Sequence, residues 1–307
     1  MTSGTTTATR IRFFLTPLPI LVIGAIICQP VRAGTSAYWT NPAGGSWTAG
    51  SNWSTAPLYP DNDQTATYDA IIDLAGDPYT IGLDSDITID NFTLNSPSAT
   101  VVHGASGVLS VVGTANIQSG TYRINDYGTI AGGTWNAAPG TMDINRAVFS
   151  DVTFNGDLEL DNESDNLWIY NDFNLNGTIT LSGYNSRLRF WGSQTFDHAT
   201  VNLSGMGSRL TFTQDDGAPP AILGPELMVY AADGTVYARN LTNRGLIQVP
   251  TGGQLTFSTR NFVNEGRIEA NGGDLEINAA GWPFLNAPGG EVLVTDGWLR
   301  ISETYGT

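Results

Sequence analysis

A block of about 21 residues repeats three times between Asp151 and Asp216, and this repeat constrains the fold more than any other feature of the sequence. Each copy contains pairs of apolar residues separated by a single residue. Apolar residues at alternate positions are typical of a short strand that presents one face to a core. Three such pairs per copy, joined by Gly, Asn, Ser and Asp, describe one turn of a three-sided coil. The clearest equivalent pairs are Leu158/Leu160, Ile179/Leu181 and Val201/Leu203.

The same pattern returns nearer the C-terminus. Asn243-x-Gly245-x-Ile247 is matched one repeat later by Asn264-x-Gly266-x-Ile268. If each copy lies on the previous one, equivalent strands pair in parallel about 4.8 Å apart and their apolar residues form continuous ladders. Recurrent asparagines at the corners can then hydrogen-bond along a column. Sandwich strands recur at irregular spacings of about 8–12 residues, which this sequence does not show.

We therefore predict an all-β chain, a right-handed parallel β-helix with three sides and about 20–24 residues per turn. The predicted domains are a signal peptide at 1–33, a Trp-rich N-terminal cap region at 34–83 and the parallel β-helix at 84–307. The predicted β-helix has about ten turns.

The N-terminal segment has the features of a secretory signal. Arg10 and Arg12 precede the apolar run from Phe13 to Cys28, and Val31-Arg32-Ala33 offers a cleavage site. The alternative is an uncleaved anchor, but the run is shorter than the roughly 20 apolar residues of a spanning helix. We expect a protein that is secreted or located at the cell surface or in the periplasm, with no membrane span after cleavage.

Charge limits the partners of the exported chain. Three of its 13 basic residues lie in the predicted signal, so the remainder carries ten arginines against all 29 acidic residues, a net charge of about −19. This charge repels nucleic acid and anionic lipid, which are excluded as partners. The one cysteine, Cys28, also lies in the signal, so no disulfide stabilises the exported chain.

Tryptophans provide the candidate ligand-binding residues. Trp39, Trp47 and Trp53 lie close together in the sequence and either cap the first turn of the coil or form an aromatic platform for sugar rings. Trp168 and Trp191 occupy outward positions beside strand pairs, where exposed rings can stack on polysaccharide or pack against a partner.

The N-terminal pattern W…GG-x-W…N-W-S…P-x-x-D, followed by N-x-G-x-I…G-x-L-x-I turns, resembles secreted bacterial parallel β-helix proteins. The similarity is to autotransporter-passenger-like and pectin-lyase-like solenoids and covers most of the exported chain. It implies the architecture; the activities it implies range from adhesins and inert stalks to lyases and hydrolases. The chain departs from that pattern because no membrane barrel follows before Thr307.

Pectin-lyase-like hydrolases use clustered aspartates, a Gly-His-Gly segment and an Arg-x-Lys segment. This chain has Val102-His103-Gly104 and Asp215-Asp216 but no lysine. No column of carboxylates forms in the well-phased turns, because Thr180 and then Asn202 follow Glu159 in its column. We therefore predict no catalytic residue.

Calcium is the one cofactor that the sequence leaves open. Its candidate ligands are Asp61, Asp63 and Asp69, and a second group, Asp161, Glu163 and Asp165, is the alternative. Ordinary turns rich in Asp and Asn explain both groups without a metal.

Two functions remain open. The first is a non-catalytic exported β-helix that serves as a cell-surface, matrix or adhesion module, with polysaccharide or surface components as partners. The second is a carbohydrate-active enzyme or polysaccharide-binding module of the pectin-lyase-like type. A groove flanked by several carboxylates and an arginine would favour the second.

Overall fold

The computed structural model describes residues 34–104, 107–279 and 284–302. These residues all belong to one compact unit, 33–307. The predicted signal peptide at 1–33 lies outside the described residues.

The described chain consists of strands and turns, and its one helix is the short 3-10 helix η1, Gly50–Asn52. The strands of the N-terminal half are β1 Thr35–Tyr38, β2 Gly45–Ser46, β3 Tyr68–Ile72, β4 Tyr79–Leu83, β5 Ile87–Ile89, β6 Asn91–His103, β7 Val108–Val111, β8 Thr114–Ile124, β9 Gly128–Ala131, β10 Thr134–Ala137, β11 Met142–Ile144, β12 Arg146–Asn155 and β13 Leu158–Leu160. Those of the C-terminal half are β14 Asn166–Leu181, β15 Arg187–Trp191, β16 Thr195–Phe196, β17 Ala199–Leu203, β18 Ser208–Thr213, β19 Ala221–Leu223, β20 Met228–Ala231, β21 Asp233–Asn243, β22 Leu246–Val249, β23 Gln254–Asn264, β24 Arg267–Asn271, β25 Asp274–Ala279, β26 Phe284–Asn286, β27 Glu291–Thr295 and β28 Trp298–Ser302.

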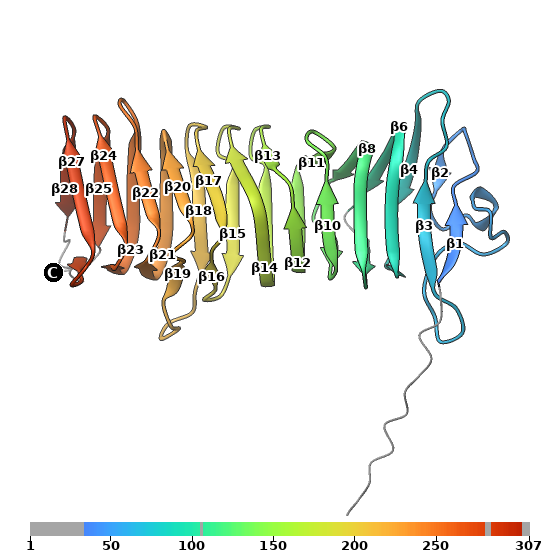
Figure 1. The fold of residues 1–307 in the computed structure, drawn as a ribbon, viewed down its shortest axis with the longest axis horizontal. Helices are drawn as coiled ribbons and strands as arrows, with labels where there is room; N and C mark the ends of the chain where they lie inside the picture. The colour runs from blue at the N-terminus through green and yellow to red at the C-terminus, as the bar shows by residue number, and fades with distance from the viewer. Residues whose placement is uncertain (1–33, 105–106, 280–283, 303–307) are drawn as a thin grey trace, which may run out of the picture. The chain divides into compact units, whose positions relative to one another are not determined.

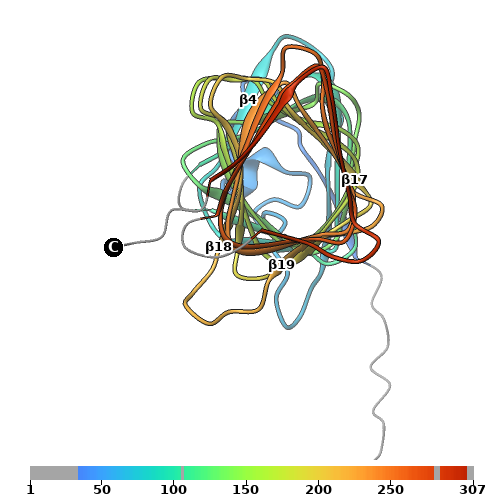
Figure 2. The same ribbon diagram turned by 90° about the vertical axis from the view of Figure 1, so that its left-hand side faces the viewer.

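The strands form a parallel β-solenoid of about 11 turns, which confirms the predicted fold class. Each turn pairs in parallel with the next, and the turns lie side by side in Figure 1. In the view of Figure 2 the turns overlie one another around a common interior. The predicted column is present, since Leu160 pairs with Leu181 and Leu181 pairs with Leu203.

Alternation along the strands separates the interior from the surface. The inward residues of β14, β15 and β18 are buried, and their rings and aliphatic groups stack from turn to turn. Phe190 and Phe212, for example, are paired in register and stack with ring centroids 4.9 Å apart. Most outward residues of the same strands are half-buried or exposed, so they form ladders that are available to partners.

Two asparagine ladders follow the corners, as the recurrent Asn positions predicted. Neighbouring members of each ladder are joined by one hydrogen bond from a side-chain amide to the amide oxygen of the equivalent residue on the next or previous turn, with N···O distances between 2.7 and 2.9 Å. These bonds satisfy amides that would be costly to bury alone. The first ladder is Asn116, Asn136, Asn155 and Asn176, and the second is Asn243, Asn264 and Asn286.

Solenoid pairing extends into the region predicted as a cap. β1 pairs with β3, and β3 pairs with β6, so the sheet begins at Thr35. The residues between β1 and β3 supply the covering structure. Gly44 shows why glycine is needed there: its φ is +76°, and a Cβ atom would lie 2.3 Å from the carbonyl oxygen of Thr80.

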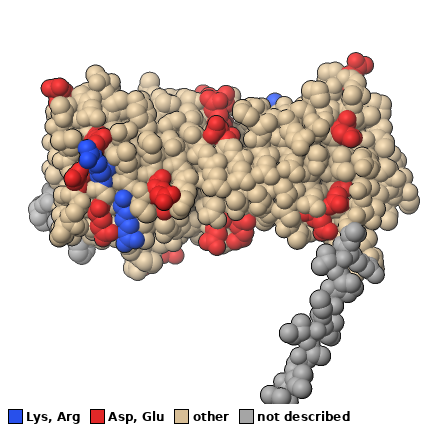
Figure 3. All heavy atoms as spheres, viewed as in Figure 1, with Lys and Arg blue, Asp and Glu red and all other residues tan. Residues whose placement is uncertain are grey.

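The surface seen in Figure 3 is sparsely charged, and its acidic atoms outnumber its basic ones. Most of the basic atoms visible on that face lie among acidic atoms near the C-terminal turns. Among the described residues, no helix has both the length and the apolar character needed to cross a membrane.

Candidate functional site

Three aromatic side chains gather on the outer face of the solenoid. Trp168 and Tyr170 lie two residues apart on β14, and Trp191 ends β15 on the next turn. The centroids of Tyr170 and Trp191 are 5.7 Å apart with their planes 20° from parallel. Trp168 lies 6.4 Å from Tyr170 and 6.3 Å from Trp191. We call Trp168, Tyr170 and Trp191 the aromatic trio.

The strand register explains why the aromatic trio forms. β14 pairs with β15, with Ile169 opposite Phe190 as an inward pair, so the residues that follow each of them, Tyr170 and Trp191, both point outward. The Trp191 side chain is 51% exposed, whereas Trp168 and Tyr170 are half-buried. The trio therefore offers one well-exposed ring, held in place by two neighbours.

A hollow of about 670 Å³ adjoins the aromatic trio. Tyr170 and Trp191 line it together with Asp172 and with uncharged polar residues, including Asn174, Ser193 and Gln194. Flat rings beside amide and hydroxyl groups suit a sugar, whose ring has apolar C–H faces and a polar rim. The structure thus brings the predicted Trp168 and Trp191 together and adds Tyr170.

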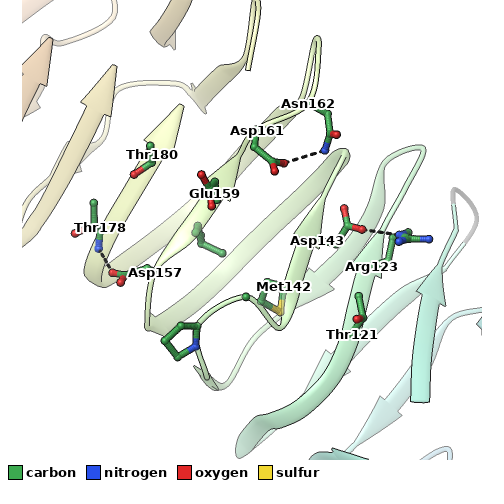
Figure 4. A pocket seen from close by; sticks show the side chains of 13 residues that line it. Thr121, Arg123, Met142, Asp143, Asp157, Glu159, Asp161, Asn162, Thr178 and Thr180 are labelled. Carbon is green, nitrogen blue, oxygen red and sulfur yellow. Dashed lines mark hydrogen bonds and ion pairs between the residues drawn. The ribbon is translucent and has the colours of Figure 1, made fainter. Parts of the chain in front are cut away.

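A second hollow, of about 690 Å³, lies on the outer face beside β13 and is lined by several acidic side chains (Figure 4). Asp157, Glu159 and Asp161 alternate along β13 and its ends, so all three lie on the outer face. Arg123 and Asp143 form an ion pair of 2.6 Å on the other side of the hollow. The acidic side chains and Arg123 at this hollow form the kind of groove that would favour the carbohydrate-active alternative.

The carboxylates of this acidic hollow each have their own partner. Asp157 accepts from the backbone N–H of Thr178 at 2.8 Å, and Asp161 accepts from the side-chain amide of Asn162 at 3.0 Å. Glu159 faces Ser182, whose hydroxyl lies 3.4 Å from it. Figure 4 shows Glu159 and Asp161 on the side of the hollow opposite the Arg123–Asp143 pair.

The other predicted aromatic residues have a different role. Trp39, Trp47 and Trp53 are buried, so the idea of an N-terminal platform for sugar rings needs correction: no ring face among these three is open to stack on a ligand. Trp53 lies 5.1 Å from Trp39 and 4.8 Å from Trp47, in edge-to-face contacts. Their indole N–H groups donate to backbone carbonyls of the N-terminal region. The cluster covers the first turns.

The predicted calcium ligands at the N-terminus accept separate hydrogen bonds. Asp61 accepts from the backbone of Thr88 at 2.9 Å, and Asp69 accepts from the Asn91 side chain at 2.7 Å. Asp63 accepts from Thr65 and from the backbone of Ala66, and these bonds, with the Thr65 side chain first, lower the pKa of its carboxyl. Within the described residues, no group of three His, Cys, Asp or Glu side chains is arranged to hold a metal ion.

The alternative group at Asp161, Glu163 and Asp165 likewise forms no metal-holding cluster within the described residues, although Asp161 and Asp165 both accept from the side-chain amide of Asn162. Asp165 is buried and accepts from the backbone N–H of Asn162 at 2.8 Å, whereas Asp161 and Glu163 are exposed. Burial raises the pKa of Asp165.

His103, from the segment compared with Gly-His-Gly, is inside the solenoid. Its Nδ1 lies 2.9 Å from the Tyr122 hydroxyl and its Nε2 lies 2.8 Å from the carbonyl oxygen of Gly107. Burial lowers the pKa of His103 to about 4. The ring is therefore neutral, donates through Nε2–H and accepts from Tyr122, and it is a core group.

Sequence reasoning missed Tyr170 and three arginines beside the trio, Arg187, Arg189 and Arg209. The signal was present, because Tyr170 lies one repeat before Trp191 and Ser186-Arg187-Leu188 recurs as Ser208-Arg209-Leu210.

Comparison of the chain with protein-family models, with curated proteins and with solved structures finds no match.

Proposed function

We propose that this protein is a non-catalytic, exported solenoid module that binds polysaccharide along its outer flank, at a cell surface or in an extracellular matrix. The single observation that carries the proposal is the aromatic trio, whose exposed Trp191 ring lies beside a polar hollow. Stacking of a sugar ring on an aromatic side chain contributes binding energy without any chemical step.

The fold supports this proposal because the trio is built on a rigid surface. Each of its residues stands on a strand whose inward neighbours are buried and whose backbone pairs with strands on both sides. A ring held by packed neighbours loses little conformational entropy on binding. Export is supported by the sequence of residues 1–33.

A glycan array probed with the purified protein tests the proposal, with Trp191→Ala and Trp298→Ala as a matched pair. Both tryptophans are about half exposed, but Trp298 lies on β28, far along the chain from the trio. We expect glycan binding that Trp191→Ala weakens about tenfold, as loss of roughly 1.4 kcal/mol of stacking implies, and that Trp298→Ala leaves unchanged. Absence of binding to any glycan would contradict the proposal.

The acidic hollow supports a second candidate, a carbohydrate-active enzyme. Inverting glycosidases use two carboxyl groups roughly 6.5–9.5 Å apart. Glu159 lies on β13, and Asp157 and Asp161 lie just beyond its two ends, so acidic side chains stand at alternate positions along this edge of the hollow. A reducing-sugar assay distinguishes the candidates: release of reducing ends that Glu159→Gln abolishes, with Glu163→Gln as the control, would establish the enzyme.

A further inference from the structure

Three arginines beside the aromatic trio lack the acidic partners that every other described arginine has. The described residues contain ten arginines, and Arg187, Arg189 and Arg209 form no ion pair among them. The partnered arginines are Arg123, Arg146, Arg239, Arg244, Arg260, Arg267 and Arg300. In a chain with 29 acidic and 13 basic residues, three neighbouring arginines without a carboxylate are unexpected. We call Arg187, Arg189 and Arg209 the arginine triad.

The strand register holds the arginine triad together. Arg187 on β15 is directly opposite Arg209 on β18, and adjacent strands lie about 4.8 Å apart. Arg189 is two residues from Arg187, on the same outward face. Like charges opposite each other destabilise a sheet, so the fold concentrates positive charge here at a cost in stability.

Arg189 is held against the aromatic trio. Its guanidinium carbon lies 4.6 Å from the Trp168 ring centroid, which is a cation–π contact. Its Nε atom is buried without a hydrogen-bond partner among the described residues, as is the Trp168 indole nitrogen. Burial, and then the charge of Arg187, lower the pKa of Arg189, but a guanidinium remains protonated.

A hollow of about 290 Å³ lies over the arginine triad. All three arginines line it, with Thr211, Thr213 and Tyr237. Thr213 is in register with Trp191, and Thr211 is in register with Arg189. The cationic hollow and the exposed ring of the trio therefore occupy neighbouring positions on the same strands.

We propose that the arginine triad and the aromatic trio form one binding site for an anionic polysaccharide, with a sugar ring stacked on Trp191 and its carboxylate or sulfate groups on the arginines. The proposal rests on the proposed function and names its ligand class. Guanidinium groups bind planar carboxylates, and likewise oxyanions such as sulfate, through paired N–H donors, and weak hydration makes arginine suited to that contact. Nucleic acid fits less well, because the acidic remainder of the surface repels a long polyanion of high charge density.

Affinity electrophoresis at about 0.15 M salt, where distant charges are screened, tests the proposal. The purified protein migrates through gels that contain polygalacturonate, dextran sulfate, poly-glutamate or neutral dextran. The test variant is Arg187→Gln/Arg209→Gln. The matched control is Arg239→Gln/Arg260→Gln, which removes the same charge from two arginines on successive turns that both contact Asp216.

We expect at least one anionic polymer to retard the wild-type protein more than dextran does. The test variant should bind it at least about tenfold more weakly, since two charge-assisted contacts are lost, and the control should bind as the wild type does. Polygalacturonate alone would identify a carboxylate ligand, and dextran sulfate alone a sulfate ester; either supports the proposal. The test variant should unfold at or above the wild-type temperature, because removing two opposed arginines relieves like-charge repulsion. Such a result excludes misfolding as the cause of weaker binding.

Several outcomes would overturn the proposal. Equal weakening in the test and control variants would show a general effect of charge. Equal binding of dextran and the anionic polymers would refute anion recognition while leaving the proposed function intact, whereas no binding to any glycan would refute both. If poly-glutamate retards the wild-type protein, neither anionic glycan does, and the test variant is no longer retarded, the triad would instead be assigned to an acidic protein partner.

Discussion

The two ends of the described solenoid bury their apolar residues to very different extents. At the N-terminal end Trp39, Trp47 and Trp53 are at most 2% exposed and cover the first turns. At the C-terminal end Leu299 and Ile301 are 39% and 45% exposed, although they continue inward columns. The residues paired with them one turn earlier, Leu275 and Ile277, are fully buried.

This difference shows that an inward position in a solenoid is buried only when something covers it. Alternation decides which way a side chain points, and the neighbouring turn or cap decides whether water reaches it. The N-terminal cluster is covered by its own loops, with indole N–H groups bonded to backbone carbonyls. Matched substitutions at the two ends measure what covering contributes to stability.

The largest expected effect is at the N-terminal cap. Trp47→Ala removes a buried ring that packs 4.8 Å from Trp53 and 5.9 Å from Phe92. We expect a loss of about 3–5 kcal/mol in the free energy of unfolding, measured by denaturant titration. Trp298→Ala, at a half-exposed tryptophan on β28, should change it by less than about 0.5 kcal/mol. Similar losses at both positions would contradict the comparison.

A leucine pair within one column sharpens the comparison. Leu275→Ala should cost about 2–5 kcal/mol, because it leaves a cavity between packed turns. Leu299→Ala, at the next position of the same column, should cost less than about 1 kcal/mol because much of its surface already meets water. The same titration measures both, and a Leu299→Ala cost as large as that of Leu275→Ala would show that the last turn is covered in solution.

The pH dependence of stability tests the polar part of the N-terminal core. The pKa of buried His103 is about 4, below the ordinary value of 6.5, so the unfolded chain binds a proton that the folded chain does not between these values. The shifted pKa of His103 therefore does not reduce the free energy of unfolding above pH 6.5. As the pH falls from 6.5 toward 4, protonation of the unfolded chain lowers that free energy, by about 3 kcal/mol in all.

Unfolding measured from about pH 7.5 to 4 checks this expectation. His103→Gln keeps a donor for Gly107 and an acceptor for Tyr122 but cannot titrate, so its stability should fall less over the same range. Identical pH profiles for the wild type and the variant would show that His103 does not contribute to the acid sensitivity.

The repeat predicted the fold well because burial repeats with it. The nearly constant offset between copies places Leu160, Leu181 and Leu203 in one column, and the corner asparagines in ladders. The N-terminal boundary was harder to place, since β1 pairs with β3 at an offset of 33 residues (Thr35 with Tyr68), whereas β3 and β4 already pair with β6 at offsets of 22 and 20.

The candidate site was predicted only in part. Trp168 and Trp191 were found from their outward positions, but burial of the N-terminal tryptophans depends on loops that have no repeat. The arginine triad can be recognised only in the structure, where each ion pair is visible. Sequence spacing does not show that Arg239 and Arg260 share Asp216. Nor does it show that Arg187 and Arg209 have no carboxylate between them.

Cysteine cross-linking across adjacent turns tests most directly whether successive turns lie in register on one another. In a Cys28→Ser background, Thr180→Cys/Asn202→Cys places thiols on paired residues of β14 and β17, and Thr180→Cys/Tyr230→Cys places them two turns apart. Adjacent strands are about 4.8 Å apart, within the roughly 4.4–6.8 Å between Cα atoms that a disulfide requires, and two turns are about 9.6 Å apart. Mild oxidation should close the first pair and leave the second open; equal closure of both pairs, or closure of the second alone, would contradict the stacked solenoid.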